Sequence, residues 1–224
     1  MIDSLRGRDA ISAAFYDGPG WVRFRPWERG FLRMVGGEIR ARMEILNHLP
    51  RADRALVLEV GIGDGENVDL LPEGWRLFGV DLARTQLEVC RRRFPFMTDR
   101  LFHAQAAKLP FDDETFDAVF SIGGFNYYDD HAQSLQEMRR VTKRGGTIVA
   151  ADEAPNLHHY TIGHWIGRPE LTAWCLRRVG LDRDFAKMVV ETEFDVAKFA
   201  REEWPGHARH RIWKRLGYCL VGGR

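Results

Sequence analysis

The chain has 224 residues, of which 45% are hydrophobic, and a formal net charge of +1 at pH 7. This length fits one α/β domain with a full core, and a charge so near zero gives no global field to recruit nucleic acid or a membrane surface. The three cysteines are widely spaced and odd in number, which disfavours a disulfide framework or a metal site. No apolar run approaches the roughly 20 residues of a membrane span. We therefore expect a single-domain cytoplasmic protein.

Residues 1–50 are expected to form a helical cap ahead of the first strand. Aromatic and arginine side chains alternate in residues 16–31, and residues 38–49 have the spacing of a helix. In one interpretation residues 16–31 are a mobile lid over a ligand cleft, in which Tyr16 contacts the ligand. In the other, an apolar helical face packs permanently on the sheet domain. The members of that face are Trp27, Phe31 and Met34.

A glycine-rich loop between two short apolar runs carries most of the functional prediction. Residues 55–60 are too short for a helix and apolar on both alternating faces, as expected of a buried parallel strand. A second strand, predicted over residues 76–80, ends at Asp81, whose carboxylate can accept hydrogen bonds from both hydroxyls of a ribose. Residues 66–71 are predicted to form a short helix between the two strands. Positive φ angles and close approach to a ligand are expected at the three glycines of the turn, Gly61, Gly63 and Gly65.

The spacing of this loop separates two kinds of nucleotide site. A dinucleotide fingerprint is G-x-G-x-x-G, in which the glycines and the start of a helix receive a pyrophosphate. Here residues 59–65 read E-x-G-x-G-x-G, so the third glycine comes one residue early. The carboxylate of Glu59, just before the turn, suits a ligand that presents a positive charge at that point. The pattern therefore favours an amino acid nucleoside over a pyrophosphate cofactor.

The pattern resembles the first two motifs of class I S-adenosylmethionine (SAM)-dependent methyltransferases, of the small-molecule type that acts in the ubiquinone and menaquinone pathways. Residues 106–119 and 135–146 are similar to later segments of the same family, so the resemblance covers residues 55–154. It implies that the loop backbone holds the methionine portion of SAM, that Glu59 places its ammonium and that Asp81 binds the ribose. The cofactor contacts that it implies are Glu59, Gly61, Gly63, Gly65, Asp81, Leu82, Gln105, Ala106, Ser121 and Tyr16.

The resemblance also implies a fold. This is a Rossmann-like, seven-stranded and mostly parallel sheet with an antiparallel last strand, helices on both faces and an N-terminal helical lid. The single domain would comprise a cap (1–50), a SAM-binding core (51–154), and C-terminal substrate-side helices with a final hairpin (155–224). Residues 185–199 are predicted to be either one helix or a helix and a strand. The other elements expected after Asp81 are helices over 83–94, 131–143 and 169–179, strands over 101–105, 116–122 and 146–151, and a hairpin over 209–222.

The loop after the fourth strand, residues 123–130, is the expected place for a methyl acceptor, because open α/β sheets bind ligands at the carboxyl ends of their strands. It lacks the proline pair of the family's base-methylating enzymes, so a small-molecule acceptor is expected and nucleic acid is not. His159 and His164 would not share a helical face, and no metal site is expected. A base is optional, and no spacing selects among the candidates, which are His131, Tyr127, Asp152, His158 and His159.

Two other functions stay open at this point. Aminopropyl transfer uses a related fold and needs an acidic pocket for a polyamine, for which the sequence offers Asp129, Asp130, Asp152 and Glu153. A non-catalytic SAM-binding scaffold would keep the same loop, because binding and chemistry use different groups. Neither the methylated atom nor the oligomeric state follows from the pattern.

Overall fold

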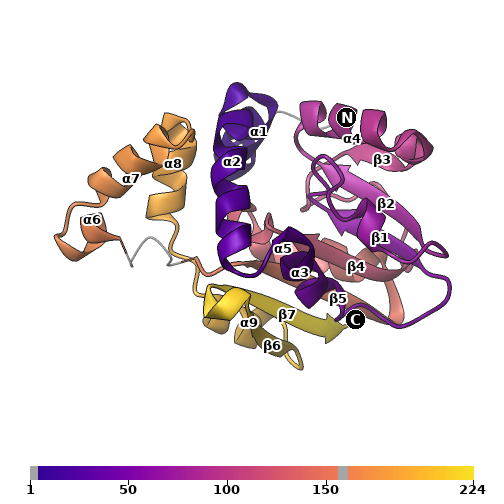
Figure 1. The fold of residues 1–224 in the computed structure, drawn as a ribbon. Helices are drawn as coiled ribbons and strands as arrows, with labels where there is room; N and C mark the ends of the chain where they lie inside the picture. Colours follow the sequence, from indigo (N-terminus) through magenta and orange to yellow (C-terminus); the bar gives the residue numbers. More distant parts are fainter. Residues whose placement is uncertain (1–4, 156–160) are drawn as a thin grey trace.

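The structure is a computed structural model that describes residues 5–155 and 161–224. Within those ranges seven strands form one sheet in the order β3-β2-β1-β4-β5-β7-β6 (Figure 1). Strands β1 to β5 run parallel, whereas β7 is antiparallel to both β5 and β6. This confirms the Rossmann-like sheet with an antiparallel last strand. The strands are β1 (Leu56–Val60), β2 (Arg76–Asp81), β3 (Leu101–His103), β4 (Phe116–Ile122), β5 (Thr142–Glu153), β6 (Ala208–Ile212) and β7 (Gly217–Gly223).

Helices cover both faces of the sheet. Helices α3 and α4 pack on one face, and α5 and α9 pack on the other. Helices α6 to α8 stand apart from the sheet, beyond α1 and α2 (Figure 1). In the described ranges no helix has the length and apolar character needed to cross a bilayer. The helices are α1 (Gly7–Asp17), α2 (Pro19–Met34), α3 (Glu38–Leu46), α4 (Arg84–Arg93), α5 (His131–Val141), α6 (Ile162–Trp165), α7 (Pro169–Arg178), α8 (Arg183–Glu191) and α9 (Val196–Glu203), with short 3-10 turns η1 (Val68–Leu70), η2 (Pro95–Arg100), η3 (Phe125–Tyr127) and η5 (Trp213–Arg215).

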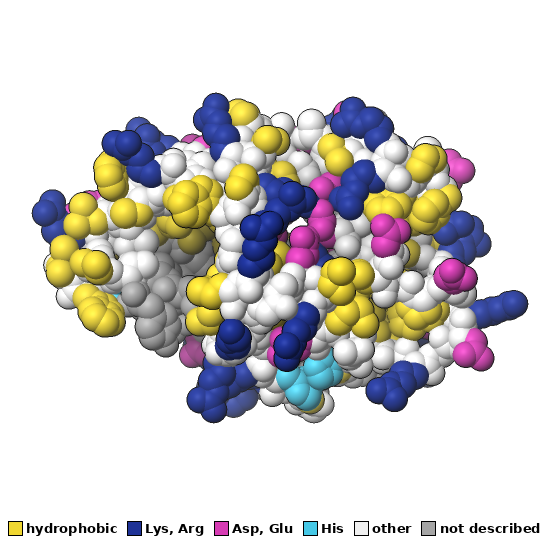
Figure 2. Space-filling model, in the orientation of Figure 1, with side chains coloured by type: hydrophobic (Ala, Val, Ile, Leu, Met, Phe, Trp, Pro, Cys, Tyr) yellow, Lys and Arg dark blue, Asp and Glu magenta, His cyan; other side chains and the backbone are white. Residues whose placement is uncertain are grey.

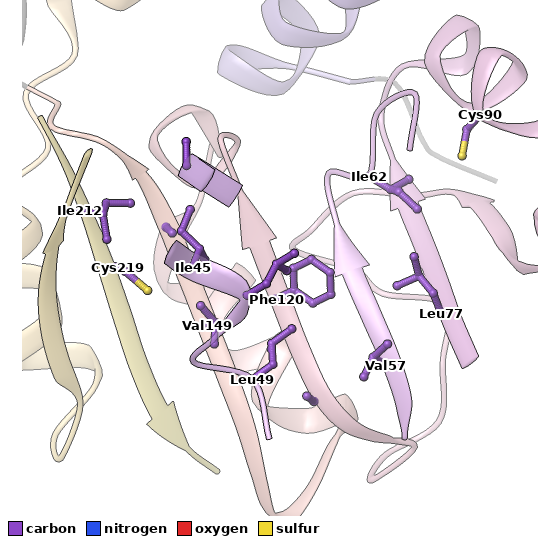
Figure 3. Close-up of a cluster of buried hydrophobic side chains, with 14 of the residues drawn as sticks. Ile45, Leu49, Val57, Ile62, Leu77, Cys90, Phe120, Val149, Ile212 and Cys219 are labelled. Atoms are coloured by element: carbon purple, nitrogen blue, oxygen red, sulfur yellow. The ribbon is translucent and has the colours of Figure 1, made fainter. Parts of the chain in front are cut away.

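The central strands are buried on both faces, which accounts for their continuous apolar sequence. In β1, Val57 belongs to the core under α3 and α4, and Leu58 to the core under α5 and α9. Figure 3 shows the first of these cores, in which Ile45 of α3 lies over Phe120 and Val149 of the sheet. Each such buried side chain stabilises the fold by about 1.5–3 kcal/mol. If the pairing of a strand shifted by one residue, each of its side chains would point into the opposite core. The register is therefore specified, and the carboxyl ends of the parallel strands lie together at one edge of the sheet.

A third, smaller core joins the two ends of the chain. Phe15 of α1 stacks on Phe185 of α8 with ring centroids 4.1 Å apart. Leu181, Ala186 and Met188 complete this buried cluster. Aromatic pairs of this kind contribute about 0.5–1.5 kcal/mol beyond the area that they bury. The N-terminal helices are therefore packed against the C-terminal ones.

Two elements differ from those expected. Residues 66–71 do not form an α-helix, because i→i+3 hydrogen bonds tighten the segment into the short η1. Residues 185–199 form neither one helix nor a helix and a strand. Helix α8 ends at Glu191, and Asp195 starts α9 by accepting a hydrogen bond from the N–H of Lys198 at 2.9 Å. Such a cap stabilises a helix start by about 1 kcal/mol, so local capping decided a boundary that hydrophobic spacing left open.

The prediction of an apolar face on α2 that packs on the sheet is wrong for two of the three residues assigned to it. Trp27 and Met34 are each 59% exposed, whereas Phe31 packs edge-on against Trp213 with ring centroids 6.2 Å apart. Trp27 instead lines a cavity between α2 and the edge of the sheet. The reason is that α2 borders this cavity and does not lie flat on the sheet.

Candidate active site

A cavity of about 580 Å³ lies at the carboxyl ends of β1, β2 and β4. The glycine-rich loop and the end of β2 form one end of the cavity. Helices α1, α2 and α8 and the end of β5 form the other end, which is largely aromatic. Both the size and the position are those of a small-molecule site on an open α/β sheet.

The glycine-rich loop presents its backbone to the cavity at two of its three glycines. Gly61 and Gly63 have φ angles of 83° and 55°, which residues with a Cβ rarely adopt. A Cβ on Gly63 would meet no atom within 4 Å, so the space beside it is open to a ligand. A Cβ on Gly65 would lie 2.8 Å from the Cys90 Sγ and 2.9 Å from the Phe94 ring. Gly65 therefore lets α4 pack on the loop and does not line the cavity.

The carboxylate of Asp81 joins the end of β2 to the loop. Its Oδ2 accepts a hydrogen bond from the Gly63 N–H at 2.7 Å, and its Oδ1 accepts one from the Ala83 N–H at 2.8 Å. Burial raises the pKa of Asp81 to about 6, despite these bonds. Asp81 also lines the cavity. Because a carboxylate has about four lone-pair sites, it can shape the loop and still accept from a ligand's hydroxyls.

Glu59 is the most deeply buried acid at this end of the cavity, with 1% of its surface exposed. Its Oε1 accepts a hydrogen bond from the Asn67 Nδ2 at 2.6 Å. Its Oε2 is buried and has no hydrogen-bond partner among the described residues. Burial raises the pKa of Glu59 to about 8. A buried carboxylate oxygen without a partner is costly, and a cationic group of a ligand in the cavity would satisfy it.

The other predicted cofactor contacts divide into two groups. Gln105 lies outside the cavity lining and donates its amide N–H to Asp9 Oδ2 at 3.2 Å. Ser121 is fully buried beneath the cavity, where its hydroxyl shares a hydrogen bond of 2.8 Å with that of Tyr128. Those that line the cavity are Leu82, Ala106 and Tyr16.

Charged side chains tie α2 to the glycine-rich loop. Arg25 of α2 forms an ion pair with Asp64 at 3.0 Å and another with Glu66. Arg93 of α4 reaches the same two carboxylates at 3.2 Å each, and Arg42 of α3 lies 3.8 Å from Glu66. Sequence reasoning missed this cluster, because its members come from separate elements and share no spacing along the chain.

Tyr127 and Glu153 form the polar part of the aromatic end of the cavity. The Tyr127 hydroxyl donates a hydrogen bond to Glu153 Oε1, and both side chains line the cavity. Burial, and then the charge of Glu153, raise the pKa of Tyr127 well above its ordinary value, so the phenol remains a donor. Sequence reasoning assigned no catalytic role to Glu153, although its position directly after a strand was a usable signal. The aromatic walls are Phe15, Tyr16, Trp21, Phe24, Trp27 and Phe185.

A buried polar network positions this pair. Asp152 is fully buried, and its Oδ2 accepts a hydrogen bond from the Asn126 N–H at 2.8 Å. The Tyr218 hydroxyl donates to Asn126 Oδ1 at 2.9 Å. Burial, and then the neighbouring Glu153, raise the pKa of Asp152 well above its ordinary value. Asp152 does not line the cavity, and its part is to hold η3, which carries Tyr127.

The structure separates the candidate bases. Tyr127 lines the cavity, whereas His131 stacks on the Phe194 ring with centroids 4.0 Å apart, away from the lining. Burial lowers the pKa of His131 to about 4. His158 and His159 lie outside the described residues. In the described part of the chain, no three His, Cys, Asp or Glu side chains gather as metal ligands.

Comparison with known proteins adds to this geometry. Residues 58–150 match the family model described as a methyltransferase domain. A malonyl-[acyl-carrier protein] O-methyltransferase from Halorhodospira halophila is 31% identical over 137 residues, which cover 59% of this chain and 45% of that protein. A demethylmenaquinone methyltransferase from Roseiflexus castenholzii is 29% identical over 182 residues, which cover 77% of this chain and 73% of that protein. The chain spans 40–45% of the length of three of the curated relatives that it matches.

Solved structures show the same fold. The crystal structure of a candidate SAM-dependent methyltransferase from Methanococcus maripaludis has a TM-score of 0.59 and 17% identity, covering 100% of this chain and 97% of that chain. The sheet order, the glycine-rich loop and the acid at the end of β2 thus define the class I methyltransferase fold. Residues 58–150 are thus similar to a methyltransferase domain, and the chain has the fold of SAM-dependent methyltransferases.

The residues at the loop end of the cavity fit SAM. The unpartnered Oε2 of Glu59 suits the ammonium of an amino acid, and the open space beside Gly63 admits a ligand close to the backbone. Asp81 has lone pairs left for ribose hydroxyls. All three groups belong to the same cavity.

Proposed function

We propose that this chain transfers the methyl group of SAM to a small, apolar acceptor that carries a protic group. The observation that supports this proposal is the continuity of the cavity. The groups that fit SAM and the aromatic walls around Tyr127 and Glu153 line one space, so cofactor and acceptor can meet without passing through solvent. An acceptor held at near-attack distance gains most of the rate that alignment can supply.

At the loop end, the chain's own groups would bind and orient the cofactor. Glu59 would pair with the ammonium, the backbone at Gly61 and Gly63 would approach the methionine portion, and Asp81 would accept from the ribose. When bound, SAM supplies an electrophilic methyl group on a positively charged sulfur. Leu82 and Ala106 would add apolar contacts, and Tyr16 of α1 would help to exclude water.

At the aromatic end, the walls select an apolar acceptor and one polar pair receives its protic group. Tyr127 stays protonated and donates to Glu153, so a hydroxyl entering this end finds a carboxylate already aligned to accept its proton. We assign to Glu153 Oε1 the role of proton acceptor and to Tyr127 that of its positioning partner. General bases of this kind contribute about 10²–10⁴-fold to rate. The matched relatives named for malonyl-[acyl-carrier protein] and demethylmenaquinone also support a non-nucleic-acid acceptor.

Aminopropyl transfer receives less support. Two of the acids considered for a polyamine pocket serve the fold: Asp129 accepts from the Arg8 N–H at 3.0 Å, and Asp130 caps α5 through the Gln133 N–H at 2.9 Å. Of the acids considered for that pocket, Glu153 is the member that lines the cavity. Asp9 of α1 and Glu28 of α2 also line the cavity, but the walls around Glu153 are largely aromatic, which favours an apolar acceptor over a polycation.

The cofactor part is tested by thermal unfolding with S-adenosylhomocysteine (SAH) and with NAD. At about 100 times its dissociation constant, SAH should add about 2.7 kcal/mol to the free energy of unfolding, and NAD should add nothing. Equal stabilisation by NAD would contradict the assignment of the loop.

The transfer part is tested with SAM labelled in its methyl group and a panel of long-chain acids, alkylphenols and polyamines. Label should pass to an apolar protic acceptor. Glu153→Gln should lower kcat by roughly 10²-fold or more with SAH affinity unchanged, and the exposed Glu191→Gln is the matched control. Strong SAH binding without transfer to any panel member would favour a scaffold, and transfer to polyamines alone would favour the aminopropyl class.

A further inference from the structure

Helices α6 and α7 carry five large apolar side chains on the molecular surface. Their exposed fractions range from 36% to 77%, although all five lie within thirteen residues of one another. In Figure 2 hydrophobic side chains gather over this part of the molecule, at the left of the view. Single exposed apolar side chains are ordinary, but a contiguous group marks an interaction surface. We name this group the α6–α7 face; it comprises Ile162, Trp165, Ile166, Leu171 and Trp174.

The same two helices reach the cavity from their other side. Thr172 and Leu176 of α7, together with Thr161 just before α6, belong to the cavity lining. The α6–α7 face and the aromatic end of the cavity are thus two sides of one thin layer. A molecule bound at the α6–α7 face would be separated from the aromatic end of the cavity only by these two helices.

Cations lie beside the apolar side chains. Arg178 lies over the Trp174 ring, with its guanidinium carbon 4.7 Å from the centroid. Arg168 pairs with Glu170 at 3.0 Å, whereas Arg177 and Arg178 make no ion pair within residues 5–155 and 161–224. A second hollow, of about 530 Å³, places Arg23 of α2 beside these two arginines. Exposed tryptophans with free arginines at their side match the boundary between acyl chains and anionic headgroups.

We propose that the α6–α7 face docks on the surface of a bilayer that contains anionic lipid, and that an apolar acceptor passes from there into the cavity. The docking step stands on the surface itself, whereas the delivery step rests on the proposed function. A second copy of the chain fits the surface less well, because a two-fold contact would bring the arginines of both copies together. The large tryptophans favour a bilayer interface, into which they can insert without a shaped pocket.

The test is co-sedimentation of the full chain with phosphatidylcholine vesicles, with and without phosphatidylglycerol. We expect binding to the anionic vesicles that falls at high salt, because surface charges are screened. Substituting Arg177→Gln and Arg178→Gln together should weaken binding by about 30-fold, or about fivefold for each cation. Trp165→Ser with Trp174→Ser should weaken it by roughly tenfold or more.

The matched control is Phe96→Ser, because Phe96 is also exposed but lies in η2, outside the α6–α7 face. Tm and SAH affinity, measured for every variant, show that the fold and the cofactor site are intact. No binding to anionic vesicles, or equal loss in the Phe96 variant, would overturn the proposal. It would also be overturned if the wild type formed dimers that the tryptophan substitutions dissociate. Vesicle binding needs neither SAM nor an acceptor, so its failure is distinct from a failure of methyl transfer.

Discussion

The two ends of the cavity are built in different ways. The loop end of the cavity, which we call the cofactor end after the proposed function, has its main groups in one stretch of chain, residues 59–82, and its key bond joins residues as close in sequence as Gly63 and Asp81. The aromatic end, which we call the acceptor end after the proposed function, is assembled from segments far apart in sequence, as in the stacking of Phe15 on Phe185. A locally encoded end can stay constant while the assembled end is remodelled. The fold can therefore keep one cofactor and change acceptors.

The ends also differ in how they treat charge. At the cofactor end, Glu59 keeps one carboxylate oxygen buried and unpartnered, which makes this acid dependent on a ligand. At the acceptor end, Glu153 is already paired with Tyr127. Substitutions at the cofactor end should therefore change cofactor affinity, whereas substitutions at the acceptor end should change turnover.

The largest effect is expected from Glu59→Gln. Above about pH 8, where Glu59 is ionised even without ligand, removing the charge leaves the cofactor's ammonium buried without its counter-ion, and breaking a buried pair costs about 3–5 kcal/mol. Calorimetry should therefore show SAH affinity lowered by at least roughly 100-fold. The exposed Glu73→Gln is the control. An unchanged affinity in the Glu59 variant would mean that the ammonium lies elsewhere.

A smaller loss is expected from Asp81→Asn. The amide can replace one acceptor of the carboxylate but not the charge, and each charge-assisted hydrogen bond is worth about 1.5–3 kcal/mol. Titration calorimetry should show weaker SAH binding, with a lower Tm because the Gly63 and Ala83 N–H groups lose one acceptor. Asp69→Asn, an exposed acid close to the loop, should change neither.

The cofactor end should also make stability depend on pH. The pKa of Glu59 is raised from 4.5 to about 8 in the folded protein, so the folded state holds this proton more tightly than the unfolded state does. Between about pH 4.5 and 8 the free energy of unfolding should therefore fall as pH rises, by up to about 1.4 kcal/mol per pH unit. Urea unfolding at several pH values should show a shallower fall in Glu59→Gln. If the free energy of unfolding fell equally with pH in the wild type and in the variant, another group would be responsible for the titration.

At the acceptor end, Phe185→Leu should separate turnover from cofactor binding. The smaller side chain loses the stack on Phe15 and costs about 1 kcal/mol of stability. The ratio kcat/KM for the acceptor should fall by roughly fivefold or more, because the change alters the wall of the acceptor end. SAH affinity should stay within about twofold, because the groups proposed to bind SAH are unchanged. Phe111→Leu, at a partly buried side chain that packs on the core away from the cavity, should cost stability without lowering kcat/KM. A large loss of SAH affinity in Phe185→Leu would break the distinction between the two ends.

The smallest effect is expected where the two ends meet, at Arg25. We propose that residues 16–31 act as a lid that the ion pairs of Arg25 with Asp64 and Glu66 hold against the loop. Partly exposed pairs are worth about 0.2–1 kcal/mol, so Arg25→Met should slightly raise hydrogen exchange in these residues. SAH should lower it in the wild type. If the segment is already as protected as α4 and α5 without ligand, it is a permanent part of the core.

Patterns in the linear sequence were enough to predict the sheet and the cofactor end. Apolar runs buried on both faces specify parallel strands, and the spacing of Glu59, Gly61, Gly63 and Asp81 places an acid and open backbone on one turn. These features depend on backbone preferences and on contacts between residues that are about twenty positions or fewer apart in the sequence. Such features leave a recognisable pattern in the linear sequence. The region and its cofactor class could therefore be predicted before any packing was known.

Which side chains face the cavity depended on how the elements pack. It turned Gly65 toward α4, engaged Gln105 with Asp9 and stacked His131 on an aromatic ring. It also brought Glu153 beside Tyr127. A cavity wall is formed by elements that are distant in sequence, and its members are selected by packing and burial instead of by spacing along the chain. Sequence patterns therefore reached residues 123–130 and Tyr127, whereas the pairing of Tyr127 with Glu153 and the stack of Phe15 on Phe185 followed from packing alone.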